Sequence, residues 1–158
     1  ASSPTISRNS AGVQVDFYHL TTSPVGAVLP RIAERVLGEG GRLLVVSADP
    51  AQRDALDRDL WAYRADAFLP HATAGDGGEP DQPVLIAEAP VPLTAARNIA
   101  LVDGRWRDEA TTFDRAFHFF DEDGIEAARA AWRALAEREG VERRYWKQDS
   151  AGRWAQVA

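Results

Sequence analysis

The chain has 158 residues, of which 45% are hydrophobic and 27% are charged, and this balance is typical of a single globular domain. The formal net charge of −6 argues against a domain whose whole surface binds phosphates, and the absence of cysteine excludes disulfides, thiolate catalysis and zinc–thiolate sites. The sequence contains neither a run of about 18 apolar residues that would span a membrane nor a secretory signal pattern, so we expect a cytoplasmic protein.

Strand and helix patterns alternate along most of the chain. Residues 1–12 are small and polar without a period, so we expect a disordered leader or cloning remnant there, followed by one domain over 13–158. Five segments have the alternating or continuous apolar patterns of strands: 13–18, 42–48, 84–87, 99–102 and 113–120. Three segments have apolar residues at helical spacing: 28–37, 49–61 and 124–139. Two further segments at the end of the chain, 145–148 and 153–156, predict a short hairpin. This order predicts an α/β fold, a Rossmann-like three-layer sandwich with a mostly parallel central sheet and helices on both faces.

Cap and turn residues support these boundaries. Asp49 and Pro50 are typical of an N-cap and a first helical position, so they begin the second helix. The glycine cluster that begins at Gly38 predicts the end of the first helix and a turn. The Thr-Thr-Ser-Pro sequence at 21–24 is typical of helix capping, and the Gly, Asp and Pro residues over 70–82 predict a loop.

Motifs for catalysis and cofactor binding are absent from the sequence. It has no P-loop string, no G-x-G-x-x-G fingerprint after the first strand and no G-x-S-x-G elbow. The three histidines, His19, His71 and His118, are not spaced as metal ligands, and we expect His19 to be structural. We therefore predict no catalytic residue, no cofactor and no metal in this chain.

Large apolar side chains gather around the end of the second helix. Trp61 lies at the helix end, and Phe68 and Pro70 follow in the connection. Three such groups form either part of the core or an exposed interface patch. The chain has five tryptophans, and composition alone does not separate core from interface positions.

A second group lies on the last helix. Arg129 and Arg133 are four residues apart and share one face beside Trp132. Two guanidinium groups that flank an aromatic ring can bind a carboxylate and an apolar side chain together. The alternative is a solvated helix flank with Trp132 in the core, and the residues alone favour this alternative.

These segments carry a family resemblance. The most specific part is the pattern L-D-x-x-L-W at 56–61 followed by F-x-P-H at 68–71. Further matches lie at 17–18, 41–45, 74–75, 83–86, 128–129 and 132–133. In this order the segments resemble the chi subunit of bacterial DNA polymerase III holoenzyme, over about 13–154.

The resemblance implies an accessory protein of the clamp-loader complex without catalytic activity of its own. Members of this family bind the psi subunit, and through it the clamp loader. They also bind the acidic, Phe-ended C-terminal tail of single-stranded DNA-binding protein. By position, the resemblance assigns Trp61, Phe68 and Pro70 to the psi interface.

The resemblance also assigns Arg129, Trp132 and Arg133 to the helix that binds the acidic tail. The chain departs from the family pattern at Ile125, where family members can carry a lysine, and it matches poorly over 143–154. The poorly matched segment supplies three further basic residues that would compensate: Arg143, Arg144 and Lys147.

Two other functions stay open at this point. A Rossmann-like sheet also suits a nucleotide- or phosphate-dependent enzyme, with His19 near its pocket. Direct binding of single-stranded DNA by tryptophan stacking requires a basic groove, which this composition does not provide. We therefore expect contact with DNA only through protein partners, no membrane contact and no small-molecule substrate.

Overall fold

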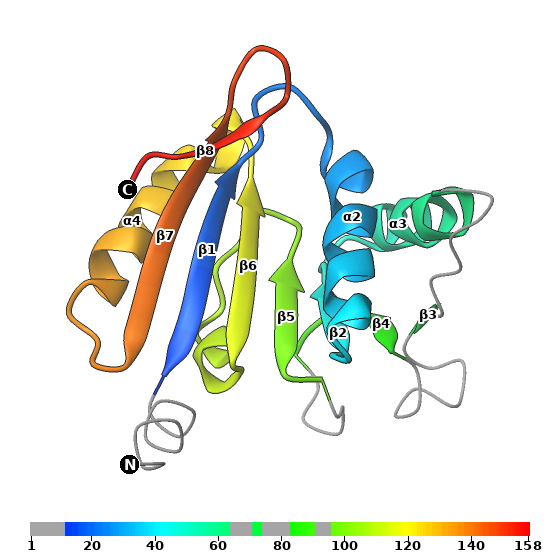
Figure 1. Cartoon of the computed structure of the whole chain (residues 1–158), viewed down its shortest axis with the longest axis horizontal. Helices are drawn as coiled ribbons and strands as arrows, with labels where there is room; N and C mark the ends of the chain where they lie inside the picture. Colours follow the sequence, from blue (N-terminus) through cyan, green and yellow to red (C-terminus); the bar gives the residue numbers. More distant parts are fainter. Residues whose placement is uncertain (1–11, 64–70, 74–82, 91–95) are drawn as a thin grey trace.

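The computed structural model describes residues 12–63, 71–73, 83–90 and 96–158, which form a central sheet with helices on both sides (Figure 1). In chain order the elements are β1 (Val13–His19), α2 (Val25–Gly38), β2 (Leu43–Val46), α3 (Pro50–Ala62), β3 (His71–Thr73), β4 (Val84–Ala87), β5 (Asn98–Leu101), the 3-10 helix η2 (Asp108–Thr112), β6 (Arg115–Phe120), the 3-10 helix η3 (Glu122–Gly124), α4 (Ile125–Leu135), β7 (Val141–Gln148) and β8 (Trp154–Gln156).

The strands of the described residues form one eight-stranded sheet in the order β3-β4-β2-β5-β6-β1-β7-β8. Every neighbouring pair is parallel except β7 and β8. β1 lies between β6 and β7, and its register places Phe17 beside His118 and Tyr145. The mostly parallel sheet and the terminal hairpin are thus confirmed.

Helices cover both faces of the sheet and create two cores. Tyr18, Val45 and Phe119 point to the face that α2 and α3 cover. The intervening strand residues, such as Phe17 and Leu44, point to the opposite face, which α4 covers. Figure 1 shows α2 in front of the sheet and α4 behind it. This is the expected three-layer α/β arrangement, and it explains why the central strands are apolar at successive positions.

Two of the predicted helix boundaries rest on the expected residues. The Asp49 side chain accepts a hydrogen bond of 3.0 Å from the N–H of Ala51, and Pro50 occupies the first position of α3. Helix α2 ends at Gly38, and Gly40 follows with φ of +82°, a left-handed conformation that favours glycine. These boundaries are therefore set by local sequence.

The expected side-chain cap of α2 is wrong. Pro24 is the N-cap residue, and no side chain caps this helix. The N–H groups of Thr21, Thr22 and Ser23 instead donate to Oε1 of Gln148 on β7, at 3.1, 3.1 and 3.2 Å. The main-chain N–H groups of this loop therefore find their hydrogen-bond acceptor on a residue 125 to 127 positions away in the sequence. A local sequence pattern cannot reveal such a partner.

Two strands extend beyond the predicted pattern. β3 lies within the segment 70–82 that we expected to be a loop, and it pairs in parallel with β4. β7 begins at Val141, four residues before the predicted hairpin. The sequence pattern did not reveal the first half of this strand, because that half is polar and most side chains of β7 are only partly buried. β6 begins at Arg115 rather than at 113, because η2 ends at Thr112 and a bend at 113–114 separates it from the strand.

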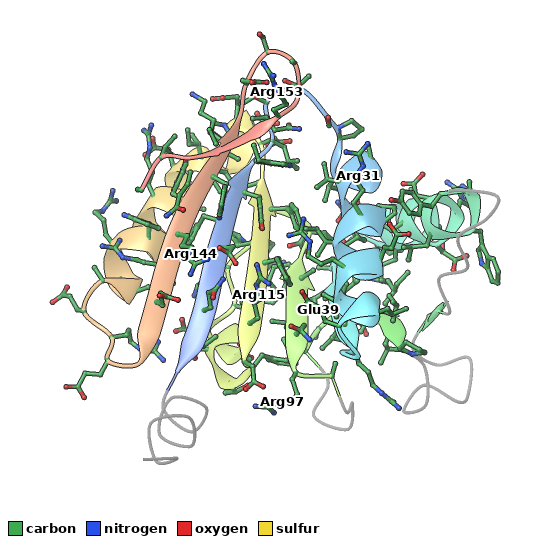
Figure 2. All side chains as sticks on the ribbon, viewed as in Figure 1. Arg31, Glu39, Arg97, Arg115, Arg144 and Arg153 are labelled. Atoms are coloured by element: carbon green, nitrogen blue, oxygen red, sulfur yellow. The ribbon has the colours of Figure 1, made fainter. Side chains whose placement is uncertain are left out.

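A buried carboxylate joins three neighbouring strands. Asp16 of β1 has no exposed surface, and its carboxylate lies 3.1 Å from the guanidinium of Arg115. Figure 2 labels Arg115 on β6. Nε1 of Trp146 on β7 donates to the other oxygen of the same carboxylate at 3.0 Å, and Gln14 donates at 3.0 Å. Both oxygens of the buried Asp16 carboxylate thus accept hydrogen bonds from neighbouring side chains.

Candidate functional site

Helix α4 divides its residues between the core and solvent. Ala128, Ala131 and Leu135 are buried against the sheet. Arg129 and Arg133 are exposed and lie four residues apart, so they share one outer face of the helix. The structure therefore leaves both predicted arginines accessible on the surface.

Trp132 lies between the core and this basic face. Its ring packs edge-on against Phe17 and Tyr145, with ring centroids 5.3 and 5.6 Å apart. The guanidinium of Arg143 on β7 lies over the ring, with Cζ 3.9 Å from the centroid. Trp132 is therefore partly buried. Its ring packs against the core, as one alternative expected, and it also lies beside the exposed arginines, as the other expected.

The charges around Trp132 are mainly positive. The guanidinium of Arg129 lies 3.6 Å from the carboxylate of Glu126, but their side chains are 55% and 85% exposed, so solvent screens this pair strongly. Burial raises the pKa of Tyr145, the nearby positive charge of Arg129 opposes this rise, and the negative charge of Glu122 adds to it. Arg129 therefore lies within electrostatic reach of the Trp132–Tyr145 pair and remains available to an anionic partner.

Trp61 lies on the other side of the sheet. It is near the end of α3, whose Leu56 and Leu60 are buried against the sheet, and 61% of its surface is exposed. Tryptophan is enriched among interface hot spots, so the exposed Trp61 is a candidate contact residue. The other two residues of this predicted group, Phe68 and Pro70, lie outside the described residues.

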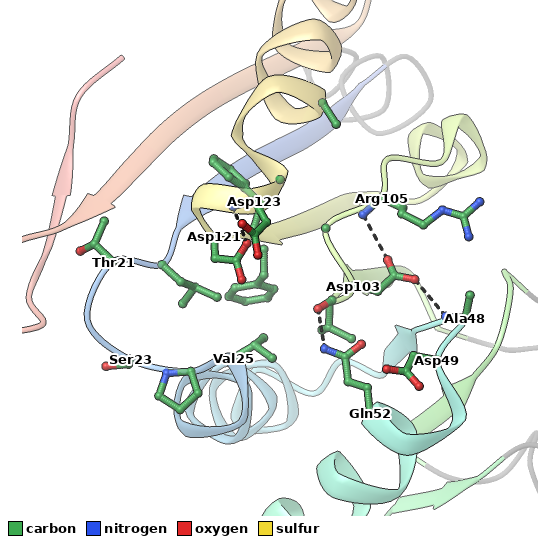
Figure 3. Close-up of a pocket in the computed structure, with 18 of the residues that line it drawn as sticks. Thr21, Ser23, Val25, Ala48, Asp49, Gln52, Asp103, Arg105, Asp121 and Asp123 are labelled. Carbon is green, nitrogen blue, oxygen red and sulfur yellow. Dashed lines mark hydrogen bonds between the residues drawn. The ribbon is translucent and has the colours of Figure 1, made fainter.

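An open cleft lies at the carboxyl ends of the parallel strands, between the starts of α2, α3 and α4 (Figure 3). Its lining holds four aspartates and one arginine, Arg105, and three of the carboxylates support local structure. Asp49 and Asp121 accept hydrogen bonds from the chain two residues further on, and Asp103 accepts from the N–H of Ala48 at 2.9 Å. Burial would raise the pKa of Asp103, but hydrogen bonds from Arg107 and Ala48 hold it below its ordinary value. These negative charges disfavour phosphate binding in the cleft.

The comparison with known proteins identifies the family. Residues 13–142 match the family described as DNA polymerase III chi subunit, HolC. The chain belongs to the DNA polymerase III chi subunit family. DNA polymerase III subunit chi of Pseudomonas aeruginosa is 35% identical over 80 residues, which span 49% of this chain and 56% of that protein. DNA polymerase III subunit chi of Escherichia coli strain K12 is 34% identical over 99 residues, which span 61% of this chain and 67% of that protein.

Basic residues beside Trp132 come from α4 and from β7. The family match includes all of α4 but only the first two residues of β7. Arg129, Trp132, Arg133 and Trp61 lie within the matched residues. The match ends at the second residue of β7, so Arg143 lies outside it. In the described part of this chi-family protein, no helix is long and apolar enough to cross a membrane, and no acidic or histidine cluster could hold a metal ion.

Two histidines of this chi-family protein have buried, structural surroundings. His19 stacks on Phe120 with ring centroids 5.1 Å apart, and its Nε2 lies 2.9 Å from Glu122 without the alignment of a hydrogen bond. His19 is not among the described residues that line the cleft. His118 has no exposed surface, and neither ring nitrogen has a hydrogen-bond partner among the described residues. Burial lowers the pKa of His118 to about 4. His71 is the first residue of β3, and its side chain lies outside the described part of the structure.

Sequence reasoning did not separate the tryptophans. Trp61 is exposed, whereas the other four are partly buried against the two cores: Trp106, Trp132, Trp146 and Trp154. It also missed the position of Arg143 over Trp132, because these two residues come from different elements. The only sequence signal for this contact was the excess of basic residues in 143–147.

Proposed function

We propose that this chi-family protein is a non-catalytic replication accessory protein. It would bridge the clamp loader, through a psi-like subunit, to the acidic C-terminal tail of single-stranded DNA-binding protein. The observation that carries this proposal is the basic face of α4, where the exposed Arg129 and Arg133 flank a partly buried Trp132.

The chemistry of this face suits an acidic peptide that ends in phenylalanine. Guanidinium groups bind carboxylates with charge-assisted hydrogen bonds, and Trp132 and Tyr145 offer aromatic edges to an apolar ring. The overall charge of −6 opposes the approach of an acidic tail, so the local positive charge must dominate at this face. Binding should therefore be strongest at low ionic strength.

The first prediction concerns Arg129. Arg129→Ala removes an exposed cation, and we expect the affinity for an acidic, Phe-ended peptide to fall by about 1–3 kcal/mol, or roughly 5- to 150-fold. Isothermal titration calorimetry at low salt measures this change. Arg31→Ala is the matched control, because it removes the same charge from the exposed surface of α2 (Figure 2). Equal affinities for Arg129→Ala and the unchanged protein would exclude Arg129 from the site.

The exposed Trp61 supports a psi-like partner on the opposite face. It is one of two large hydrophobic side chains that are exposed in the described part of the chain, the other being Val157. Interface hot spots are enriched in tryptophan, because its large rigid side chain gains contact area at a small entropic cost. Phe68 and Pro70 belong to the same proposal through their sequence positions.

The second prediction follows from this exposure. Trp61→Ala should leave the melting temperature nearly unchanged, because Trp61 adds little to the core. The affinity for a purified psi-like subunit should fall by at least about 2 kcal/mol, roughly 30-fold, in surface plasmon resonance. Val157→Ser is the control, since it removes an exposed apolar group at the C-terminal end of the chain. If Trp61→Ala bound the psi-like subunit as tightly as the unchanged protein does, the partner surface would have to lie elsewhere.

The absence of catalysis is also part of the proposal. The cleft at the strand ends is the usual ligand position of this fold class. Its acidic lining and the structural use of Asp49, Asp103 and Asp121 support a binding protein rather than a phosphate-dependent enzyme.

A further inference from the structure

Arg143 has two contacts with a single residue of α4. Its Nη1 donates to the main-chain carbonyl of Trp132 at 2.7 Å, and its Cζ lies 3.9 Å from the centroid of the Trp132 ring. The Trp132 carbonyl is among the last four of α4, which have no partner within a regular helix. Arg143 therefore lies fixed at the border between α4 and β7.

The remaining hydrogen-bonding capacity of Arg143 is open. A guanidinium has five N–H donors. Among the described residues, only the Trp132 carbonyl accepts a hydrogen bond from this side chain. The side chain is only partly buried, so its other donors remain available to a ligand.

Strand alternation places Arg143 on the same side of the sheet as α4. Val141 and Tyr145 pack into the core beneath α4, and Arg143 lies between them in the sequence. Arg129 approaches the same Tyr145 from the helix, since its charge affects the pKa of Tyr145. The positive charge of α4 therefore continues on to β7, around one pair of aromatic rings.

We infer that the acidic-tail site is formed by two elements, and that Arg143 of β7 is its third basic contact, beside Arg129 and Arg133 of α4. This inference rests on the proposed function and names a ligand contact outside the matched family residues. Ile125 supplies no charge, and Arg143 provides a replacement from a different element. Because the guanidinium is already immobilised on Trp132, binding loses less side-chain entropy than it would with a free arginine.

The test compares Arg143→Ala with Arg144→Ala in calorimetric titrations of the acidic, Phe-ended peptide. Arg144 is the next residue of the same strand, points to the opposite face and lies 3.5 Å from Glu142. We expect Arg143→Ala to weaken binding about 5- to 20-fold and to make binding less sensitive to salt, whereas Arg144→Ala changes it less than about 2-fold. Arg143→Lys keeps the charge but loses the planar fork, so it should restore only part of the affinity.

The outcomes separate the two proposals. If the unchanged protein did not bind the peptide at low salt, both the proposed function and this inference would be wrong. If Arg129→Ala weakened binding and Arg143→Ala did not, only the inference would be wrong. A lower melting temperature with unchanged affinity in both Arg143 variants would show that Arg143 merely caps α4.

Discussion

Replacement of Asp16 by alanine is expected to destabilise the fold by about 2–3 kcal/mol, the cost typical of removing a buried charged group that accepts hydrogen bonds from partly buried partners. The Asp16 carboxylate is fully buried and joins Arg115 of β6 to Trp146 of β7. Its removal leaves the guanidinium of Arg115, whose side chain is 28% exposed, and the partly buried indole N–H of Trp146 without their acceptor. This loss is a large fraction of the stability of an ordinary domain.

Urea unfolding monitored by tryptophan fluorescence measures this effect. Asp114→Ala is the matched control, because Asp114 pairs with Arg97 at 3.0 Å while both side chains are more than half exposed. Its free energy of unfolding should change by less than about 1 kcal/mol. A similarly small change for Asp16→Ala would mean that water or side-chain rearrangement satisfies Arg115 in the variant.

His118 should make the stability depend on pH in the acidic range. Its pKa is about 4 in the folded state, against an ordinary value of 6.5, because burial among Phe17, Trp106 and Phe120 disfavours the charged ring. Between these two pKa values the unfolded chain binds more protons than the folded chain does. The free energy of unfolding should therefore decrease as the pH falls from about 6.5 to about 4, by roughly 3 kcal/mol from this residue alone.

The difference between the unchanged protein and His118→Leu isolates this contribution, since carboxylates also titrate in the acidic range. We expect the leucine variant to lose less stability on acidification, and the gap between the two curves should grow as the pH falls from 6.5 to 4. Chemical unfolding at several pH values measures both curves. Parallel curves over this interval would indicate that His118 becomes protonated without cost, for example through solvent access.

The sequence predicted the fold where burial produced a simple pattern. The central strands are covered on both faces, so their apolar runs were recognisable, and Asp49 and Gly40 set helix boundaries by local geometry. β3 is only three residues long and lies in a segment with loop-like composition, and the first half of β7 is polar, so neither strand has such a run. The loop before α2 depends on Gln148, a contact across most of the chain.

The candidate site was predictable only in part. The spacing of Arg129 and Arg133 on one helix predicts their common face, and the structure leaves both side chains exposed. The contact between Arg143 and Trp132 depends on the packing of β7 against α4, which no local pattern specifies. The partners assigned to these residues remain proposals.

The position of β7 also determines where the chain can be shortened. Most of β7 lies beyond residue 142, where the family match ends, yet this strand pairs with β1 along the whole length of β1. A recombinant fragment cut at the family boundary would lose Trp146 and uncover the edge of β1, whose side chains are largely apolar. Exposed apolar edges recruit further strands, so such a fragment would tend to self-associate. A soluble truncation therefore has to keep β7, which ends at Gln148.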